Sequence, residues 1–394
     1  MSKTIGEACN IVTGKLDANQ AVKNGDYPFF TCAEFPERID QYAFDDDVIL
    51  IAGNNARGNF HVGRYNGKFN AYQRTYVLTA KHGYDIDYIY YALKLELKRL
   101  REKAQGSQTK FLTMPILTGI SLGNISATEQ PRVSTVLKFL DQKIDLNNRI
   151  NAELEAMAKT LYDYWFVQFD FPDINGKPYK TSGGKMVYNP TLKREIPMGW
   201  ASGTLDDLGQ IVGGSTPSTG NPENFTAKGI PWITPNDLSD NQGNKFISHG
   251  ALDVSEKGVK NASLKKHPAG TVLLSSRAPI GYMAIARNEV TTNQGFKSFI
   301  PSKGYSTEFV FYAVKHALPK IVKNASGSTF KEVSGSVLKK IEITLPEISV
   351  VNRFTKNVIN IFSRQDKLEL ENQQLSVLRD WLLPMLMNGQ VTVK

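Results

Sequence analysis

The chain has 394 residues, more than one ordinary hydrophobic core organises, so two or three domains are expected. Hydrophobic residues make up 41% and charged residues 22%, as in a globular protein, and the net charge of +9 favours a polyanionic partner such as nucleic acid. Two cysteines argue against a disulfide scaffold and a four-ligand zinc site. No signal-like segment and no run near the ~18 apolar residues of a membrane span is present, so a cytoplasmic protein is expected.

Residues 1–130 are predicted to form one domain of mixed α/β class. Residues 48–52 form a short apolar run that is typical of a buried strand, and residues 76–78 are a second strand candidate. Residues 87–102 have the composition of a helix.

A long helix is predicted at 131–170, because apolar residues recur from 133 to 165 at alternating steps of four and three. This heptad seam is typical of a helix that packs one narrow stripe against another helix. The seam returns 221 residues later, and polar Asn151 then falls on polar Asn372, a pattern that fixes register. The predicted seam residues are Leu137, Leu140, Ile144, Asn151, Leu154 and Leu161, with Val358, Ile361, Leu368, Asn372, Leu375 and Leu382.

Residues 171–200 are rich in Pro and Gly and are predicted to be a linker without regular elements. A second mixed domain is predicted at 201–345, with a strand at 272–274. Its helix at 309–322 is expected to break at Pro319 or to be confined to the part before it. The second long helix, 346–390, closes the chain.

An internal repeat relates the two halves. Between 84–122 and 305–343, 11 of 39 positions are identical without a gap. Shorter matches upstream relate the Ile-Val-x-Gly strings that begin at Ile11 and Ile211. The order is therefore domain, helix, domain, helix. An antiparallel helix pair would put the domains at opposite ends, roughly 50 Å apart for a 33-residue helix, whereas a parallel pair would put them side by side.

The chain resembles the specificity subunits of type I restriction–modification systems. The resemblance rests on the duplicated order and on strings at 196–200 (IPMGW), 214–218 (GSTPS), 230–237 (IPWITPND), 275–281 (SSRAPIG) and 292–296 (TNQGF), with 67–69 (GKF) and 72–76 (YQRTY). It implies two pseudo-repeated α/β target recognition domains, each reading one half of an interrupted asymmetric DNA sequence, separated by an antiparallel two-helix coiled coil.

The resemblance also implies partners for this chain. The coiled coil would dock modification subunits, two in number, which methylate adenine, and restriction subunits would join them. The chain itself would bind no cofactor, while S-adenosylmethionine, ATP and Mg²⁺ would bind only to the partner subunits. The first domain lacks the GSTPS and SRAP strings of the second, so it is expected to read a different half-site.

Reading of bases in the major groove requires Arg, Lys, Asn, Gln and small hydroxyl side chains on loops. Arg277 is the sharpest candidate, because it follows a strand and precedes a Pro-Gly turn. For any single candidate, a surface or turn-forming role remains equally open. The candidates are Arg57, Lys68, Arg74 and Lys110 in the first domain, and Ser215, Thr216, Asn236, Ser276, Arg277, Gln294, Lys297, Ser328, Thr329 and Lys331 in the second.

Catalytic motifs are missing from the sequence. There is no G-x-x-x-x-G-K-[ST] loop and no Asn/Asp-Pro-Pro-aromatic string, and the five histidines show no metal-ligand spacing. A non-enzymatic DNA reader is therefore predicted. Two alternatives remain: a protein-binding scaffold with two domains on a coiled coil, and a nuclease or methyltransferase with an unrecognised motif. Aromatic residues near Trp165 and Trp381 predict either a partner surface or burial against a neighbouring domain.

Overall fold

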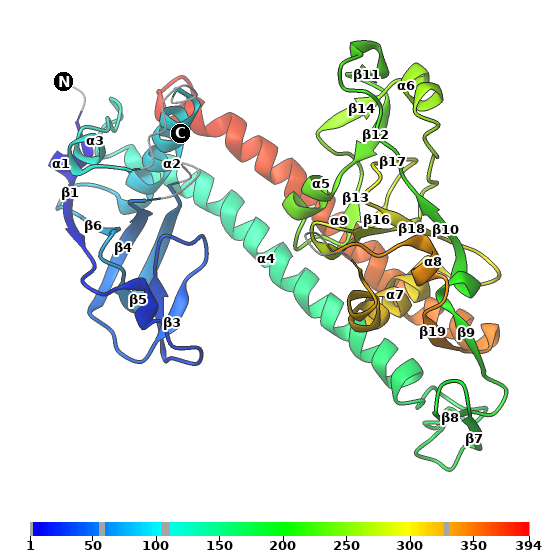
Figure 1. Cartoon of the computed structure of the whole chain (residues 1–394). Helices are drawn as coiled ribbons and strands as arrows, with labels where there is room; N and C mark the ends of the chain where they lie inside the picture. The colour runs from blue at the N-terminus through cyan, green and yellow to red at the C-terminus, as the bar shows by residue number, and fades with distance from the viewer. Residues whose placement is uncertain (1–2, 55–59, 104–110, 327–330, 394) are drawn as a thin grey trace. The chain divides into compact units, whose positions relative to one another are not determined.

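The computed structural model describes residues 3–54, 60–103, 111–326 and 331–393 and divides into two compact units. The first unit comprises Met1–Leu146 and Asn372–Lys394, and the second comprises Asn147–Glu371. Two long helices, α4 (Gln130–Tyr162) and α9 (Ile348–Met387), each contribute residues to both units (Figure 1). Among the described segments, no helix combines the length and hydrophobicity that crossing a bilayer requires.

The first unit is built on a six-stranded sheet in the order β1-β6-β4-β5-β2-β3. Val48 and Leu50 of β4 pack in one hydrophobic cluster, while Ile49 and Ile51 pack in another with helix α2. Since both faces of β4 are covered, its apolar run is continuous, and the strand predicted there is confirmed. The elements are β1 (Cys9–Thr13), β2 (Tyr27–Phe30), β3 (Glu37–Ile39), β4 (Phe44–Ala52), β5 (Val62–Ala71), β6 (Thr75–Ala80), α1 (Ile5–Ala8), α2 (Ile86–Lys103) and α3 (Met114–Thr118).

The second unit contains a five-stranded sheet in the order β10-β18-β15-β16-β13 and a four-stranded sheet in the order β11-β14-β12-β17, while β19 pairs with β9. Its strands are β9 (Ala201–Thr204), β10 (Gly209–Gly213), β11 (Phe225–Thr226), β12 (Ile230–Ile233), β13 (Phe246–Ile247), β14 (Leu252–Val254), β15 (Val272–Ser276), β16 (Ile280–Ala286), β17 (Thr291–Thr292), β18 (Lys297–Pro301) and β19 (Glu342–Leu345). Its further helices are α5 (Pro235–Asp240), α6 (Glu256–Asn261), α7 (Thr307–Lys323) and α8 (Gly335–Leu338).

The repeat seen in the sequence is a repeat of strand pairing. Antiparallel strands β1, β6, β4 and β5 correspond to β10, β18, β15 and β16, with the same register. Helix α2 begins at Ile86 and α7 begins at Thr307, which keeps the 221-residue offset. Opposite residues across the four strands are Ile11, Leu78, Ile49 and Arg64 in the first unit, and Ile211, Phe299, Val272 and Ile285 in the second.

The two long helices pair in antiparallel fashion. In the second unit, the Asn147 side chain donates a hydrogen bond to Glu371 (2.8 Å), and the Gln365 side chain donates one to the Asn151 carbonyl (3.2 Å). Residue numbers therefore rise along α4 as they fall along α9, which excludes the parallel arrangement. Every predicted seam residue is buried or half-buried in the structure.

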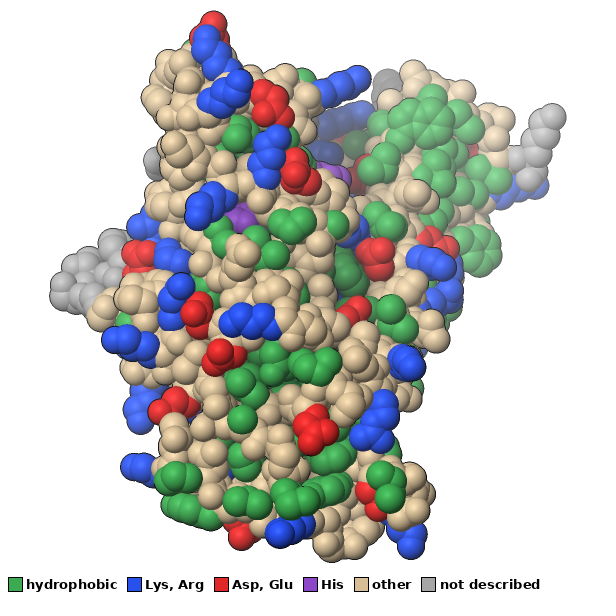
Figure 2. Space-filling model, turned by 90° about the vertical axis from the view of Figure 1, so that its right-hand side faces the viewer, with side chains coloured by type: hydrophobic (Ala, Val, Ile, Leu, Met, Phe, Trp, Pro, Cys, Tyr) green, Lys and Arg blue, Asp and Glu red, His purple; other side chains and the backbone are tan. Residues whose placement is uncertain are grey.

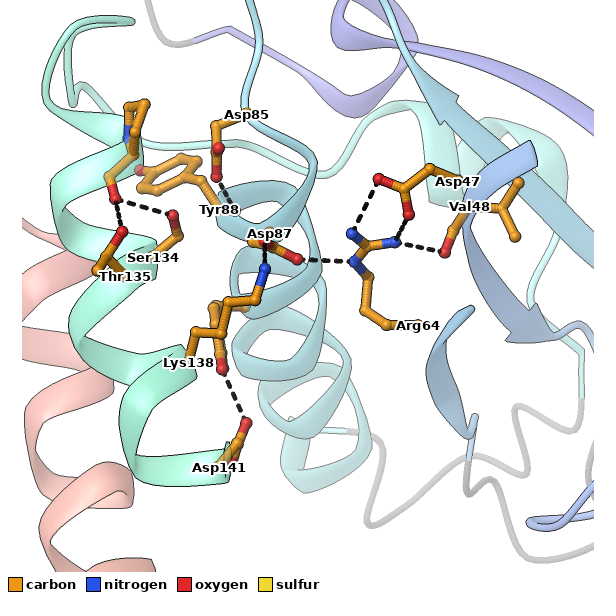
Figure 3. Close-up of polar contacts among 12 residues, drawn as sticks. Asp47, Val48, Arg64, Asp85, Asp87, Tyr88, Ser134, Thr135, Lys138 and Asp141 are labelled. Carbon is orange, nitrogen blue, oxygen red and sulfur yellow. Dashed lines mark hydrogen bonds and ion pairs between the residues drawn. The ribbon is translucent and has the colours of Figure 1, made fainter. Parts of the chain in front are cut away.

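A polar network fixes the strands of the first unit to α4 (Figure 3). Arg64 on β5 forms ion pairs with Asp47 on β4 (2.6 Å) and Asp87 on α2 (2.8 Å). Asp87 also pairs with Lys138 on α4 at 2.6 Å. Burial opposes ionisation of Asp87, but the two cations outweigh burial and lower its carboxyl pKa. The aspartate thus stays charged and holds sheet, α2 and α4 together.

The second unit has its own network around buried Lys245. The Lys245 ammonium lies 2.7 Å from a Glu155 oxygen on α4 and donates to Gln365 on α9 at 2.6 Å. The Glu369 carboxylate on α9 accepts the Lys245 backbone N–H at 2.7 Å and pairs with Arg287 of the loop after β16 at 2.7 Å. Sequence reasoning gave no sign of this network, because its members are distant in the chain.

Two expectations about prolines and the linker are wrong. The segment 171–200 contains a hairpin of β7 (Met186–Asn189) and β8 (Arg194–Pro197), in which Pro197 ends a strand instead of preventing one. Helix α7 continues past Pro319 to Lys323. Pro319 lies on the exposed side of the helix, where water can satisfy the carbonyl that loses its N–H partner.

Candidate nucleic-acid interface

Sequence strings that were predicted to carry DNA contacts meet at one end of the five-stranded sheet. The Ser215 N–H donates to the Thr292 carbonyl (3.0 Å), and the Ser276 N–H donates to the Gly295 carbonyl (2.7 Å). The Val333 N–H in turn donates to the Ser276 carbonyl (3.0 Å). We call this region the polar end: it comprises residues 215–216, 276–277, 292–297 and 331–333.

Two glycines make the close approach of these loops possible. A Cβ atom on Gly214 would lie 2.2 Å from the carbonyl oxygens of Thr292 and Asn293, so only glycine fits there. A Cβ atom on Gly295 would lie 3.0 Å from Pro235. Because glycine lacks this atom, the start of α5, with its exposed Asn236, can lie next to the same loops. The glycines of the GSTPS and TNQGF strings therefore act by positioning polar neighbours.

Most candidate side chains at the polar end reach solvent. Thr216 and Gln294 are exposed and hydrogen-bonded to each other, and Lys331 is exposed. Ser215 is half-buried, and its carbonyl accepts a hydrogen bond from Trp232 at 3.1 Å. These side chains offer the mixture of donors and acceptors that base reading requires.

Ser276 needs a correction. Its side chain is fully buried, and its hydroxyl has no hydrogen-bond partner among the described residues. A side chain inside the sheet cannot contact a base without rearrangement, so Ser276 is removed from the candidate contacts. Its backbone still matters, since both its N–H and its carbonyl tie loops together at the polar end.

Arg277 and Lys297 flank a carboxylate that sequence reasoning missed. Glu332 lies 3.6 Å from an Arg277 nitrogen and 3.9 Å from the Lys297 ammonium. Burial, aided by Arg277, lowers the pKa of Lys297, while Glu332 opposes that shift. No pattern in the sequence could have identified Glu332, because its approach to Arg277 comes from the fold.

The first unit repeats this backbone arrangement with other side chains. The Gly53 N–H donates to the Arg74 carbonyl (2.8 Å), and the Leu112 N–H donates to the Gly53 carbonyl (3.0 Å). These bonds correspond to those of Ser276 in the second unit. Arg74 is exposed on the turn between β5 and β6, and Lys68 on β5 lies with its ammonium 4.7 Å from the Tyr42 ring centre. The other candidates, Arg57, Lys110, Ser328 and Thr329, lie outside the described residues.

Aromatic residues at the ends of the long helices divide into two groups. Trp165 and Phe166 are buried in the core of the second unit, where Phe166 packs against Phe309 of α7. The burial reading therefore holds for this helix end. Trp381 on α9 is 58% exposed, which leaves it available to a partner.

Comparison with known proteins places these features in context. The family model described as type I restriction modification DNA specificity domain matches residues 1–156 and 197–379. The type I restriction enzyme MjaIX specificity subunit of Methanocaldococcus jannaschii is 41% identical over 197 residues, covering 48% of this chain and 45% of that protein. The HindI specificity subunit of Haemophilus influenzae is 28% identical over 343 residues, covering 75% of this chain and 74% of that protein. The chain thus spans about half the length of the first relative and about three quarters of the second.

A solved structure has the same fold. The crystal structure of a type I restriction–modification system S subunit from M. genitalium aligns with a TM-score of 0.60 at 16% identity, covering 98% of this chain and 95% of that one.

Proposed function

Because the chain belongs to the family defined by the type I restriction modification DNA specificity domain, we propose that it is the sequence-reading subunit of such a complex. Each unit reads one half of an interrupted, asymmetric DNA sequence. Helices α4 and α9 dock two modification subunits, which methylate adenine, and restriction subunits join the assembly. The chain is not itself catalytic, and S-adenosylmethionine, ATP and Mg²⁺ bind to the partners.

The observation that carries this proposal is the duplicated backbone at the polar end. The hydrogen bonds through Ser276 and Gly53 hold equivalent loops in equivalent places. The side chains on those loops differ, so two similar scaffolds present two different sets of donors and acceptors. This is what an asymmetric site requires, since each half must be recognised separately.

The charge distribution supports base reading over simple attraction to phosphate. The net charge is +9, and on the face drawn in Figure 2 the Lys and Arg side chains are interspersed with Asp and Glu. A surface of this kind makes a limited number of phosphate contacts, and its specificity comes from the base edges.

Exposed apolar side chains on the long helices support the docking of partners. Phe139 and Met157 on α4 are 65% and 59% exposed, and Val377 on α9 is 70% exposed. A partner protein that covered these side chains would remove their apolar surface from water, which would stabilise the complex. The same side chains also favour the alternative function, a scaffold that binds only proteins.

Salt dependence of DNA binding separates the two functions. For the full chain with double-stranded DNA, three phosphate contacts predict a loss of affinity of about 40-fold between 50 and 200 mM salt. Such a loss supports the DNA reader. If DNA does not bind at low salt while partner proteins bind with little dependence on salt, the scaffold function replaces it.

A further inference from the structure

The polar end carries a side-chain pair that differs between the two units at an equivalent backbone position. In the second unit, Arg277 and Glu332 form an isolated antiparallel bridge. In the first unit the corresponding bridge joins Asn54 and Phe111. The backbone is thus duplicated while the chemistry changes from a neutral pair to a cation beside a carboxylate. A position of this kind can distinguish what the two units recognise.

Glu332 is held in place by its backbone. Its N–H donates to the Ser326 carbonyl (2.9 Å), and its carbonyl accepts from the Ser326 N–H (3.0 Å). The next residue, Val333, bonds to Ser276 of β15. The backbone that carries the carboxylate is therefore held next to the last residues of a central strand. This restraint reduces the conformational entropy lost when the carboxylate binds a ligand.

The side chains of this pair keep free hydrogen-bonding capacity. The distances of 3.6 Å from Arg277 and 3.9 Å from Lys297 are longer than a hydrogen bond. Among the described residues, neither the Arg277 guanidinium nor the Glu332 carboxylate forms a side-chain hydrogen bond. Both groups are partly exposed, at 35% and 41%. A guanidinium offers only donors, and a carboxylate offers only acceptors.

A guanidinium, which offers two parallel donors, beside a carboxylate acceptor matches a G·C pair better than an A·T pair, because adenine presents a single major-groove acceptor, N7, beside its N6 donor. In the major groove, guanine presents two acceptors, N7 and O6, and cytosine presents the N4 amino donor. Arginine pairs with guanine, and a carboxylate accepts from cytosine. Thymine O4 would face the carboxylate with a second acceptor, and a phosphate would face it with negative charge, so both are disfavoured.

We propose that Glu332 is a specificity-determining residue of the second unit, whose carboxylate accepts a hydrogen bond from cytosine N4 while Arg277 donates to guanine. The half-site read by this unit therefore contains a G·C pair. This inference rests on the proposed function and adds one residue and one base-pair class to it.

The test maps adenine methylation in cells that express the chain with its modification and restriction subunits. Glu332→Ala removes the acceptor, and Glu332→Gln keeps the shape while adding donors, which suits adenine. Glu256→Gln is the matched control, because Glu256 on α6 also pairs with a lysine, Lys266, at 2.8 Å. Thermal unfolding of each purified chain checks that the variants fold.

The expected result is a change at one position. Glu332→Ala should reduce discrimination at a single G·C pair by about 10-fold or more, and Glu332→Gln should admit A·T there, while the other half and the control keep the wild-type motif. The inference is overturned if both folded variants methylate the unchanged motif, if methylation falls equally at all sites, or if the wild-type half-site lacks a G·C pair. Failure of the proposed function looks different, since no methylated motif would then depend on the wild-type chain.

Discussion

The hydroxyls of Tyr91 and Tyr312, which the repeat relates, donate hydrogen bonds to two carboxylates of the same helix, α4. Tyr91 donates to Asp141 at 2.8 Å, and Tyr312 donates to Glu155 at 3.0 Å. Burial first, and then the neighbouring carboxylate, raises the pKa of both phenols, so both remain protonated donors. Each acceptor is also paired with a cation, Asp141 with Arg379 of α9 at 2.7 Å. A duplicated tyrosine thus fastens each domain to the coiled coil.

Replacing these tyrosines should weaken the attachment of each domain to α4. Tyr91→Phe and Tyr312→Phe each remove a hydrogen bond to a charged acceptor, and each should lower the free energy of unfolding by about 1–2 kcal/mol. Tyr188→Phe is the control, because Tyr188 is 62% exposed. Urea unfolding measures all three. Losses below about 0.5 kcal/mol in both variants would show that the two hydroxyls do not stabilise the fold.

The Lys245 network predicts an asymmetry between its two partners. Burial lowers the pKa of Lys245 to about 8, and Glu155 opposes this shift. Glu155→Gln leaves a buried ammonium with less compensation and should cost about 2–3 kcal/mol. Lys245→Met should lower the free energy of unfolding by less. Glu155 keeps its ion pair with Lys315 (2.7 Å), and the methionine side chain fits beside the Phe362 ring. Unfolding in denaturant compares the two, and a costlier Lys245→Met would contradict this account.

Buried His267 makes the second unit sensitive to acid. Burial lowers its pKa to about 4, and its Nε2 lies 3.2 Å from the Thr292 hydroxyl. In the unfolded chain the imidazole has a pKa near 6.5, so on acidification it is protonated before the imidazole of the folded chain. Stability therefore falls as the pH drops from about 6.5 towards 4. At pH 5.5 the loss from this residue is about 1.4 kcal/mol.

His267→Asn should remove that part of the pH dependence. Melting temperatures between pH 7.5 and 5 measure it, with exposed His249→Asn as the control. Equal slopes in wild type and His267→Asn would mean that other groups cause the acid sensitivity.

Exchange of the second recognition domain tests whether the two units read separately. Replacing residues 201–345 by the matching domain of a relative should change one half of the methylated motif and leave the other half as it was. The first boundary lies directly after the linker, at the start of β9, and the second lies at the end of β19, before α9. A motif altered in both halves, or in neither, would contradict reading by separate domains.

The sequence predicts the periodic part of this fold well. The heptad seam and the 221-residue offset reflect helices that bury one stripe, and α2 and α7 begin at equivalent positions. The run at 48–52 is continuously apolar because both faces of β4 are covered, and this run predicts the strand. These features depend on local spacing, which a single sequence contains.

Other features depend on contacts between distant residues and could not be predicted. Pro319 looks like a helix break until its exposed position is known, and Ser276 looks like a DNA contact until its burial is known. The partnership of Glu332 with Arg277 exists only because a bridge aligns two segments far apart in the chain. The seams alone leave the helix direction open; the antiparallel arrangement is expected from the family resemblance, and the pairing of Gln365 with Asn151 confirms it.

The most direct test of the central claim is a long-read map of adenine methylation in the host, with and without this chain. If the chain is the sequence reader, an interrupted, asymmetric motif is methylated in its presence and unmethylated in its absence, and its return on complementation identifies the sequence. Unchanged methylation in a host whose modification subunits are expressed and active would contradict the claim.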